Sequence, residues 1–140
     1  MKDPIVILDD KIAGFDCDDT LVMWTETPAD YQPGEGKIAI VDPYKTTPSG
    51  DPIYIYLTPH KKHIQKLKGY SKSGWFVIVW SMGGGAWAKN VADALGITNK
   101  ASLIIGKPSI IYDDMPLAEA FGQRKYMQDK KKKKSPPDII

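Results

Sequence analysis

The chain is poor in cysteine and has no long apolar run. Its 140 residues include one cysteine, Cys17, which excludes a disulfide within the chain and fits a reducing, cytoplasmic compartment. No apolar stretch reaches the length that crosses a membrane, so we expect no membrane partner. The short apolar run at residues 5–8 is interrupted by Asp9 and Asp10, which argues against a signal peptide.

Charge is distributed unevenly along the chain. The formal net charge is +2, but five lysines and Asp138 give residues 130–140 a charge of +4, which leaves −2 on the remainder. This segment has no apolar periodicity, so we expect one domain over residues 1–128 and a disordered Lys-rich tail over residues 129–140. The tail either keeps the protein soluble or attracts a polyanion such as nucleic acid.

An acidic motif follows the apolar run that begins at Ile12. Asp16, Asp18 and Asp19 stand close together, and Thr20 completes the pattern Asp-x-Asp-x-Thr. An apolar run with this ending is typical of a buried strand that leads into an exposed loop. Carboxylates this close repel one another, and a hard divalent cation with oxygen ligands, most simply Mg²⁺, relieves the repulsion. The alternative, a solvated acidic turn, is disfavoured by the residues that follow.

Three further strand-like runs end beside polar or charged residues. Residues 75–80 lead to Ser81 and a glycine-rich segment, residues 102–105 lead to Lys107, and residues 109–112 lead to Asp113 and Asp114. An additional strand at residues 5–8 is expected to pair with the one that carries Asp16. Parallel strands bring their carboxyl ends to one edge of a sheet, where ligands gather. We therefore expect these side chains to meet there.

Two helices are expected between these strands. Thr58 and Pro59 suit the start of the first, and Gly69 suits its end. Its inner stripe consists of Ile64 and Leu67. The second helix follows the glycine-rich segment, ends at Gly96 and has four apolar residues at helical spacing: Trp87, Val91, Ala94 and Leu95.

A hairpin is expected between the acidic motif and the first helix, with strands at residues 37–41 and 53–57. Alternation places Ile53, Ile55 and Leu57 on one face of the second strand. Tyr54 and Tyr56 lie on the other face, where they either pack the hairpin onto the body or stack on a base or ring.

The order of acid pair, hydroxyl, lysine and acid pair resembles the four motifs of the haloacid dehalogenase superfamily of phosphohydrolases. The resemblance extends from about Ile12 to Gly122. It implies an α/β fold, a Rossmann-like three-layer sandwich with a central, mainly parallel sheet. It also implies a β-hairpin flap at about residues 31–57, and the short insertion leaves no room for a large cap.

The resemblance also assigns roles to residues. It implies that Asp16 is the nucleophile that forms an aspartyl-phosphate, and that Asp18 protonates the leaving oxygen and later activates water. Lys107 would neutralise the negative charge of the nucleophile and of the transferring phosphoryl group. Phosphate binding would involve Thr20, Ser81, Met82, Gly83 and Lys107. Mg²⁺ would be held by the Asp16 carboxylate, the Asp18 backbone carbonyl, Asp114 as the favoured direct ligand and Asp113 through a water.

These assignments predict a Mg²⁺-dependent phosphomonoesterase that acts on a phosphorylated small molecule. Three alternatives stay open: a phosphatase for polynucleotide ends, a phosphotransferase, and a non-catalytic phosphate-binding or regulatory protein of the same fold.

Several other residues are expected to carry no chemistry. Cys17 is a filler position with a raised thiol pKa, the two histidines are surface groups, and three tryptophans belong to the core: His60, His63, Trp75, Trp80 and Trp87.

Overall fold

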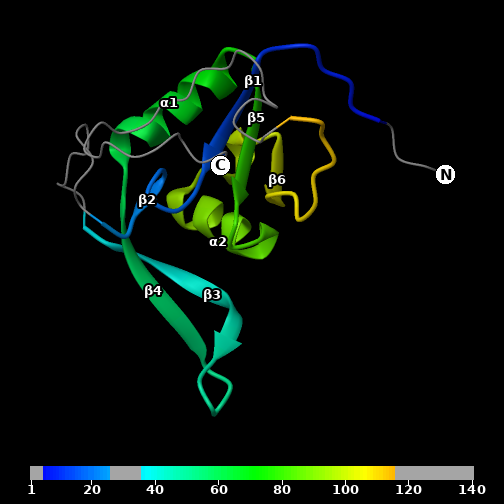
Figure 1. Cartoon of the computed structure of the whole chain (residues 1–140). Coiled ribbons are helices and arrows are strands. Elements are labelled where there is room, and N and C mark those ends of the chain that lie inside the picture. The colour runs from blue at the N-terminus through cyan, green and yellow to red at the C-terminus, as the bar shows by residue number, and fades with distance from the viewer. Residues whose placement is uncertain (1–4, 26–35, 116–140) are drawn as a thin grey trace.

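The structure, a computed structural model, describes residues 5–25 and 36–115 and has a mixed α/β fold. A three-stranded parallel sheet has the strand order β1-β5-β6, and a three-stranded antiparallel sheet has the order β2-β4-β3 (Figure 1). The elements are β1 (Ile12–Asp16), β2 (Val22–Met23), β3 (Ile38–Thr46), β4 (Pro52–Pro59), α1 (Lys61–Lys72), β5 (Phe76–Ser81), α2 (Gly85–Leu95), a 3-10 turn (Thr98–Lys100) and β6 (Leu103–Gly106).

One face of the parallel sheet is buried by the helices. Val77 and Val79 of β5 are fully buried on this face, and Phe15 of β1 meets the ring of Tyr70 from α1 edge-on. The other face is less covered within the described part of the chain, where Ile12 and Leu103 are 43% and 39% exposed. The α/β fold and the parallel sheet are thus confirmed. A third layer is not seen among residues 5–25 and 36–115.

The first helix differs at both ends from the sequence prediction. Thr58 and Pro59 do not begin it, because they continue β4 and pair with β2. His60 caps α1 instead, and its Nδ1 accepts a hydrogen bond from the backbone N–H of His63. The helix also continues past Gly69 to Lys72. Its inner stripe is confirmed, since the buried residues of α1 are Ile64 and Leu67.

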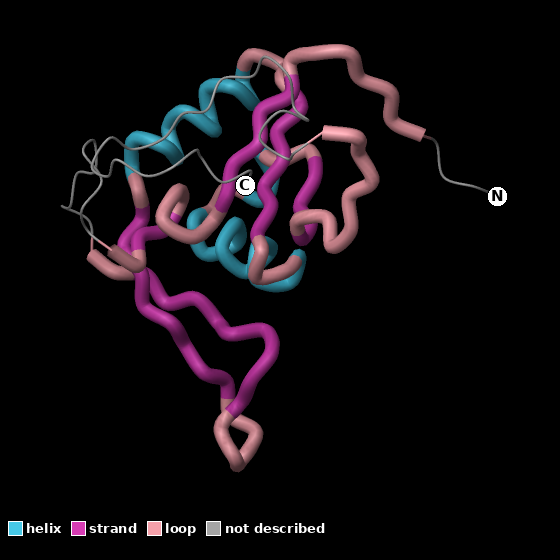
Figure 2. The backbone as a smooth tube through the Cα atoms, in the orientation of Figure 1, coloured by secondary structure: helices cyan, strands magenta, loops and turns pink. Residues whose placement is uncertain are grey.

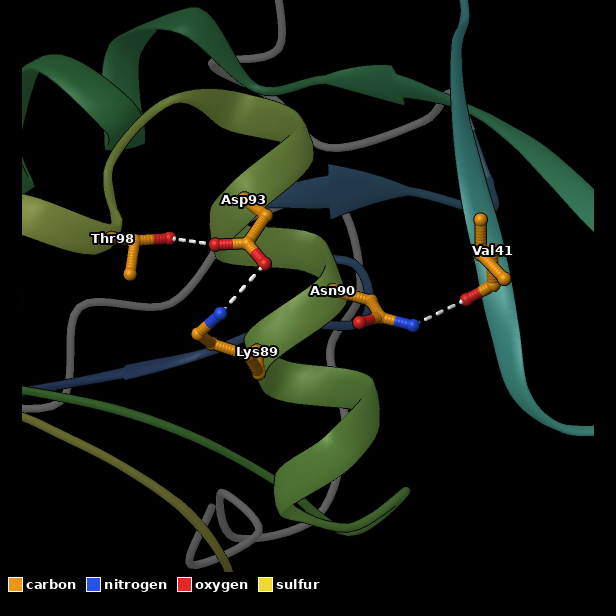
Figure 3. A network of polar contacts seen from close by, with 5 residues as sticks. All are labelled: Val41, Lys89, Asn90, Asp93 and Thr98. Carbon is orange, nitrogen blue, oxygen red and sulfur yellow. Dashed lines mark hydrogen bonds and ion pairs between the residues drawn. The ribbon is translucent and has the colours of Figure 1, made fainter.

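The second helix is confirmed, including its end at Gly96, whose φ of 70° suits a glycine cap. Its buried residues are Trp87, Ala88, Val91 and Ala92. Ala94, expected on the buried side, is exposed. Figure 3 shows how the outer face of α2 is held: Lys89 pairs with Asp93 at 2.8 Å, and the Thr98 hydroxyl donates to the same carboxylate. The bond between Thr98 and Asp93 ties the turn that leads to β6 to the end of α2.

The hairpin strands β3 and β4 are present and longer than predicted, and they project from the rest of the molecule (Figure 2). At the base of the hairpin, the Asn90 side chain of α2 donates to the Val41 carbonyl of β3 at 2.8 Å (Figure 3). Tyr54 and Tyr56 are 48% and 59% exposed, so both rings are accessible rather than packed onto the body. Residues 31–35 of the expected flap lie outside the described residues.

Two predicted strands are absent from the described part of the chain. Residues 5–8 and 109–112 have no regular secondary structure, and Ile5 and Ile110 are 76% and 74% exposed. An apolar run forms a strand only where a neighbouring strand accepts its hydrogen bonds. Neither run pairs with β1 or β6 here. The Lys-rich tail at residues 129–140 lies outside the described residues, and no described helix is long and apolar enough to cross a membrane.

Candidate functional site

The carboxyl ends of the three parallel strands bring the first site residues together. β1 ends at Asp16, β5 ends at Ser81, and β6 ends one residue before Lys107. Asp16 is in register with Trp80, and Ser81 is in register with Gly106. Residues that are 65 and 91 positions apart from Asp16 in sequence therefore share one edge of the sheet.

Asp16 and Lys107 form a largely buried ion pair at this edge. The Asp16 Oδ1 lies 3.1 Å from the Lys107 Nζ, and the two side chains are 16% and 8% exposed. Burial raises the pKa of Asp16 above its ordinary value, Lys107 opposes the rise, and Asp18 adds to it. The result is a carboxylate that has lost most of its water and faces one fixed positive charge.

The loop after β1 is closed by hydrogen bonds to its own backbone. The Cys17 carbonyl accepts the N–H groups of Thr20, Leu21 and Val22. Asp19, to which the sequence assigns no role, has a φ of 57°, and its Oδ1 accepts the backbone N–H of Trp24 at 2.8 Å. Because this bond spans the loop, Asp19 fixes the loop on which Asp18 is carried.

Thr20 joins the loop through its backbone. The Thr20 N–H donates to the Cys17 carbonyl, as described above. The Thr20 carbonyl accepts a hydrogen bond at 2.8 Å from the Nδ1 of His63 in α1. His63 thereby ties the helix to the acidic loop. His60 was predicted to be a surface residue, and this prediction is wrong. His60 is fully buried, and its ring stacks on that of His63 with centroids 3.6 Å apart.

Asp18 has two partners that the sequence did not indicate. Its Oδ1 accepts hydrogen bonds from the indole Nε1 of Trp24 at 2.9 Å and of Trp87 at 3.1 Å. Trp87 is a core residue as expected, at 6% exposed. The sequence offers only a general indication of these contacts. A buried indole N–H requires a hydrogen-bond acceptor, but the sequence does not identify that acceptor.

Ser81 organises the loop at residues 82–85, called the glycine loop below, and the approach of Lys107. The Ser81 side chain is 1% exposed, and its Oγ accepts the Gly83 N–H at 2.9 Å. Its carbonyl accepts the N–H of Lys107 at 3.0 Å and of Gly84 at 3.1 Å. A direct contact between this hydroxyl and a phosphoryl group remains a prediction. The Met82 side chain, also predicted at the phosphate site, is 82% exposed.

The glycine loop needs glycine because other backbone lies against it. A Cβ on Gly85 would lie 3.2 Å from the Gly106 backbone nitrogen, so the loop packs directly on the end of β6. Gly84 has a φ of 100°, a conformation that other residues rarely adopt. The Tyr44 hydroxyl of the hairpin lies against Gly84 and donates to the Gly83 carbonyl at 2.7 Å.

A cleft of about 250 Å³ opens between this loop and the hairpin. Aromatic and apolar side chains make up much of its lining, and Asp18 and Asp42 contribute carboxylates. The lining residues are Asp18, Trp24, Asp42, Pro43, Tyr44, Ile55, Gly83 and Trp87. The cleft therefore gives a ligand room beside Asp18 and beneath the hairpin.

Asp113 and Asp114 are not brought to this edge. Both are exposed, and the Asp113 Oδ1 accepts the Met115 N–H at 3.0 Å. Among the described residues, no three His, Cys, Asp or Glu side chains form a group that could hold a metal ion. The physical reason is the missing strand at residues 109–112, which was expected to direct the pair to the site. Their part in metal binding stays a prediction.

Cys17 is a buried free thiol beneath this loop. Its pKa is raised chiefly by burial, and the charges of Asp16 and Asp18 raise it further. A thiol that resists ionisation is a poor nucleophile, so its expected role as a filler position agrees with its environment.

Removing the Tyr44 hydroxyl should loosen the hairpin. We expect Tyr44→Phe to lower the free energy of unfolding by about 1 kcal/mol, because the Gly83 carbonyl loses its donor. Urea unfolding measures the change. Tyr54→Phe is the matched control, since Tyr54 is also a half-exposed residue of the same hairpin. Equal effects of the two variants would show that the bond to Gly83 contributes nothing.

Comparison of the chain with models of protein families, with characterised proteins and with solved structures finds no match. The chain's own geometry is therefore the structural basis for a function. That geometry consists of a buried Asp16–Lys107 pair, a neighbouring Asp18 held by two indoles, and a cleft that reaches Asp18.

Proposed function

We propose that this protein is a phosphomonoester hydrolase of the haloacid dehalogenase type, with Asp16 as its nucleophile. The observation that carries the proposal is the ion pair of Asp16 and Lys107, 3.1 Å long and largely withdrawn from water at the carboxyl edge of a parallel sheet. A carboxylate attacks phosphorus effectively when positive charge balances the phosphoryl oxygens. Asp18, two residues further on, supplies the acid and base that ester cleavage requires.

In the proposed first step, a carboxylate oxygen of Asp16 forms a bond to phosphorus as the bond to the ester oxygen breaks. Asp18 gives its proton to that departing oxygen, so the product leaves as an alcohol. In the second step Asp18 takes a proton from water, and the resulting hydroxide attacks the aspartyl-phosphate. Inorganic phosphate leaves and Asp16 is regenerated. Lys107 balances negative charge in both steps.

The described residues do not complete a magnesium site. Asp16 and Asp18 offer oxygen ligands, but Mg²⁺ prefers near-octahedral oxygen coordination, and Asp113 and Asp114 do not join them. Magnesium remains part of the proposal on the strength of the family resemblance and of two neighbouring carboxylates that would repel each other.

We expect EDTA to abolish hydrolysis of p-nitrophenyl phosphate and added Mg²⁺ to restore it. The measurement is initial rate against free Mg²⁺ concentration after exhaustive dialysis. Ca²⁺ serves as a control cation, because it prefers a larger and more flexible coordination shell. Full activity in EDTA would remove magnesium from the proposal and leave Lys107 as the principal positive charge at the site.

The test of the function itself is a substrate panel with wild-type protein and the Asp16→Asn variant. The panel contains sugar phosphates, nucleoside monophosphates and end-phosphorylated oligonucleotides, with phosphate release as the readout. Activity that the variant retains would belong to a contaminant or to another mechanism. An acceptor alcohol added to the assay distinguishes hydrolysis from phosphotransfer, and binding without turnover would favour the non-catalytic alternative.

A phosphatase for polynucleotide ends is the second candidate. The exposed Tyr54 and Tyr56 rings offer a surface on which bases stack, although this is the face of β4 opposite to Ile55, which lines the cleft. Faster hydrolysis of oligonucleotide ends than of mononucleotides would support it.

We also propose the Rossmann-like three-layer sandwich as the complete architecture. The half-exposed face of the sheet, with Ile12 and Leu103, is where a third layer would pack.

A further inference from the structure

The carboxylate of Asp18 is held in an unusual way. Two indole N–H groups, from Trp24 and Trp87, converge on the same oxygen, Oδ1, at 2.9 and 3.1 Å. The two tryptophans are 63 positions apart in sequence. Their ring centroids are 6.5 Å apart, and both rings line the cleft beside Asp18. This arrangement suggests that the tryptophans serve the proton chemistry proposed above, on which the inference rests.

Each tryptophan is fixed by the fold. Trp87 lies in the first turn of α2 and is 6% exposed, so packing determines its orientation. Trp24 is 52% exposed, and its backbone N–H is bound to the Asp19 Oδ1 at 2.8 Å. A tryptophan this exposed contributes little to a core. Its indole bond to Asp18 therefore calls for an explanation other than packing.

The chemistry of the two donors determines which oxygen can carry a proton. An indole N–H only donates and does not titrate at ordinary pH. A carboxylate oxygen has two lone pairs, and two N–H bonds to Oδ1 use both. A proton on Asp18 must therefore reside on Oδ2.

We propose that Trp24 and Trp87 are positioning residues that hold Asp18 by Oδ1 and leave Oδ2 as the oxygen that gives and takes the proton. Without them the carboxyl group can rotate, and either oxygen can face the substrate. Their effect is then largest where the departing oxygen most needs a proton. A purely structural role for the two rings would affect all substrates alike.

The test uses Trp24→Phe and Trp87→Phe, which keep an aromatic ring and remove the N–H. Trp75→Phe is the matched control, because Trp75 packs on Tyr70 and makes no bond to Asp18. Rates are measured with an alkyl phosphate, whose leaving oxygen needs a proton, and with p-nitrophenyl phosphate, whose leaving oxygen scarcely does. We expect each variant to lose roughly tenfold on the alkyl phosphate and much less on the other substrate, as for a lost hydrogen bond to a charged group.

Equal losses on both substrates would overturn the inference while leaving the proposed hydrolase intact. Trp24 provides the safer variant, because its half-exposed ring tolerates substitution better than buried Trp87. A wild-type protein without phosphatase activity would overturn the proposed function and, with it, the role of the tryptophans in proton transfer.

A second readout does not depend on turnover. In ¹H–¹⁵N spectra, the variants assign the indole signals of Trp24, Trp87 and Trp75. Asp18→Ala should shift the first two signals and leave that of Trp75 unchanged, because only the first two lose an acceptor. Unchanged signals from Trp24 and Trp87 would overturn the inference whatever the enzyme activity.

Discussion

Asp16→Asn is expected to abolish phosphatase activity and leave the fold intact. The substitution removes the attacking negative charge and the partner of Lys107 at nearly constant volume. Phosphate release with p-nitrophenyl phosphate measures the loss, and circular dichroism checks the fold. Asp51→Asn is the matched control, because Asp51 is an exposed residue of the β3–β4 turn. Wild-type turnover in Asp16→Asn would contradict the assignment of the nucleophile.

The stability of Asp16→Asn relative to wild type is also expected to depend on pH. Burial raises the pKa of Asp16 above its ordinary value of 3.8, so ionised Asp16 destabilises the folded state. The stabilising contribution of this group is complete below pH 3.8 and is lost as pH rises through the folded-state pKa. The variant also leaves the largely buried Lys107 without its carboxylate partner, and this loss opposes the gain. In metal-free buffer the stability of Asp16→Asn relative to wild type should therefore rise from low to neutral pH. Urea unfolding measures this trend; a relative stability of the variant that rises toward low pH would contradict the stated cause.

Asp18→Asn is expected to lower the rate by roughly a hundredfold or more on substrates with poor leaving groups. The amide oxygen of Asn can still accept the two indole bonds, so the change tests proton transfer more than position. The loss should be smaller with p-nitrophenyl phosphate. Comparing kcat/KM across substrates with leaving groups of graded pKa measures this dependence. A loss that is the same for every leaving group would mean that Asp18 mainly organises the loop.

Local sequence pattern predicted the parts of the fold that depend on local interactions. The strands that end at Asp16, Ser81 and Gly106 were identifiable because short apolar runs precede polar loop residues. The end of α2 at Gly96 follows from the freedom of glycine to adopt a positive φ. The approach of Lys107 to Asp16 required, in addition, the order of motifs along the chain.

The sequence predictions failed where contacts with residues distant in sequence determine the secondary structure or the side-chain partners. Thr58 and Pro59 have the residue types of a helix start, but pairing with β2 recruits them into β4. Residues 109–112 have the apolar pattern of a strand but no strand partner among the described residues. The bonds from Trp24 and Trp87 to Asp18 could not be read from sequence, since a tryptophan pattern reports burial and not the direction of the indole N–H.

The Ser81 carbonyl accepts hydrogen bonds from both Lys107 and Gly84, so the lysine and the glycine loop share one anchor. The backbones of Lys107 and of the glycine loop, which form the floor of the site, are therefore joined at one atom, and the hairpin above them is bonded to the glycine loop through Tyr44. In the proposed hydrolase, such a division would separate the reacting groups from the segment that selects the substrate. Transplanting a different hairpin between β2 and α1 would then redirect the proposed activity to new substrates without rebuilding the reacting groups.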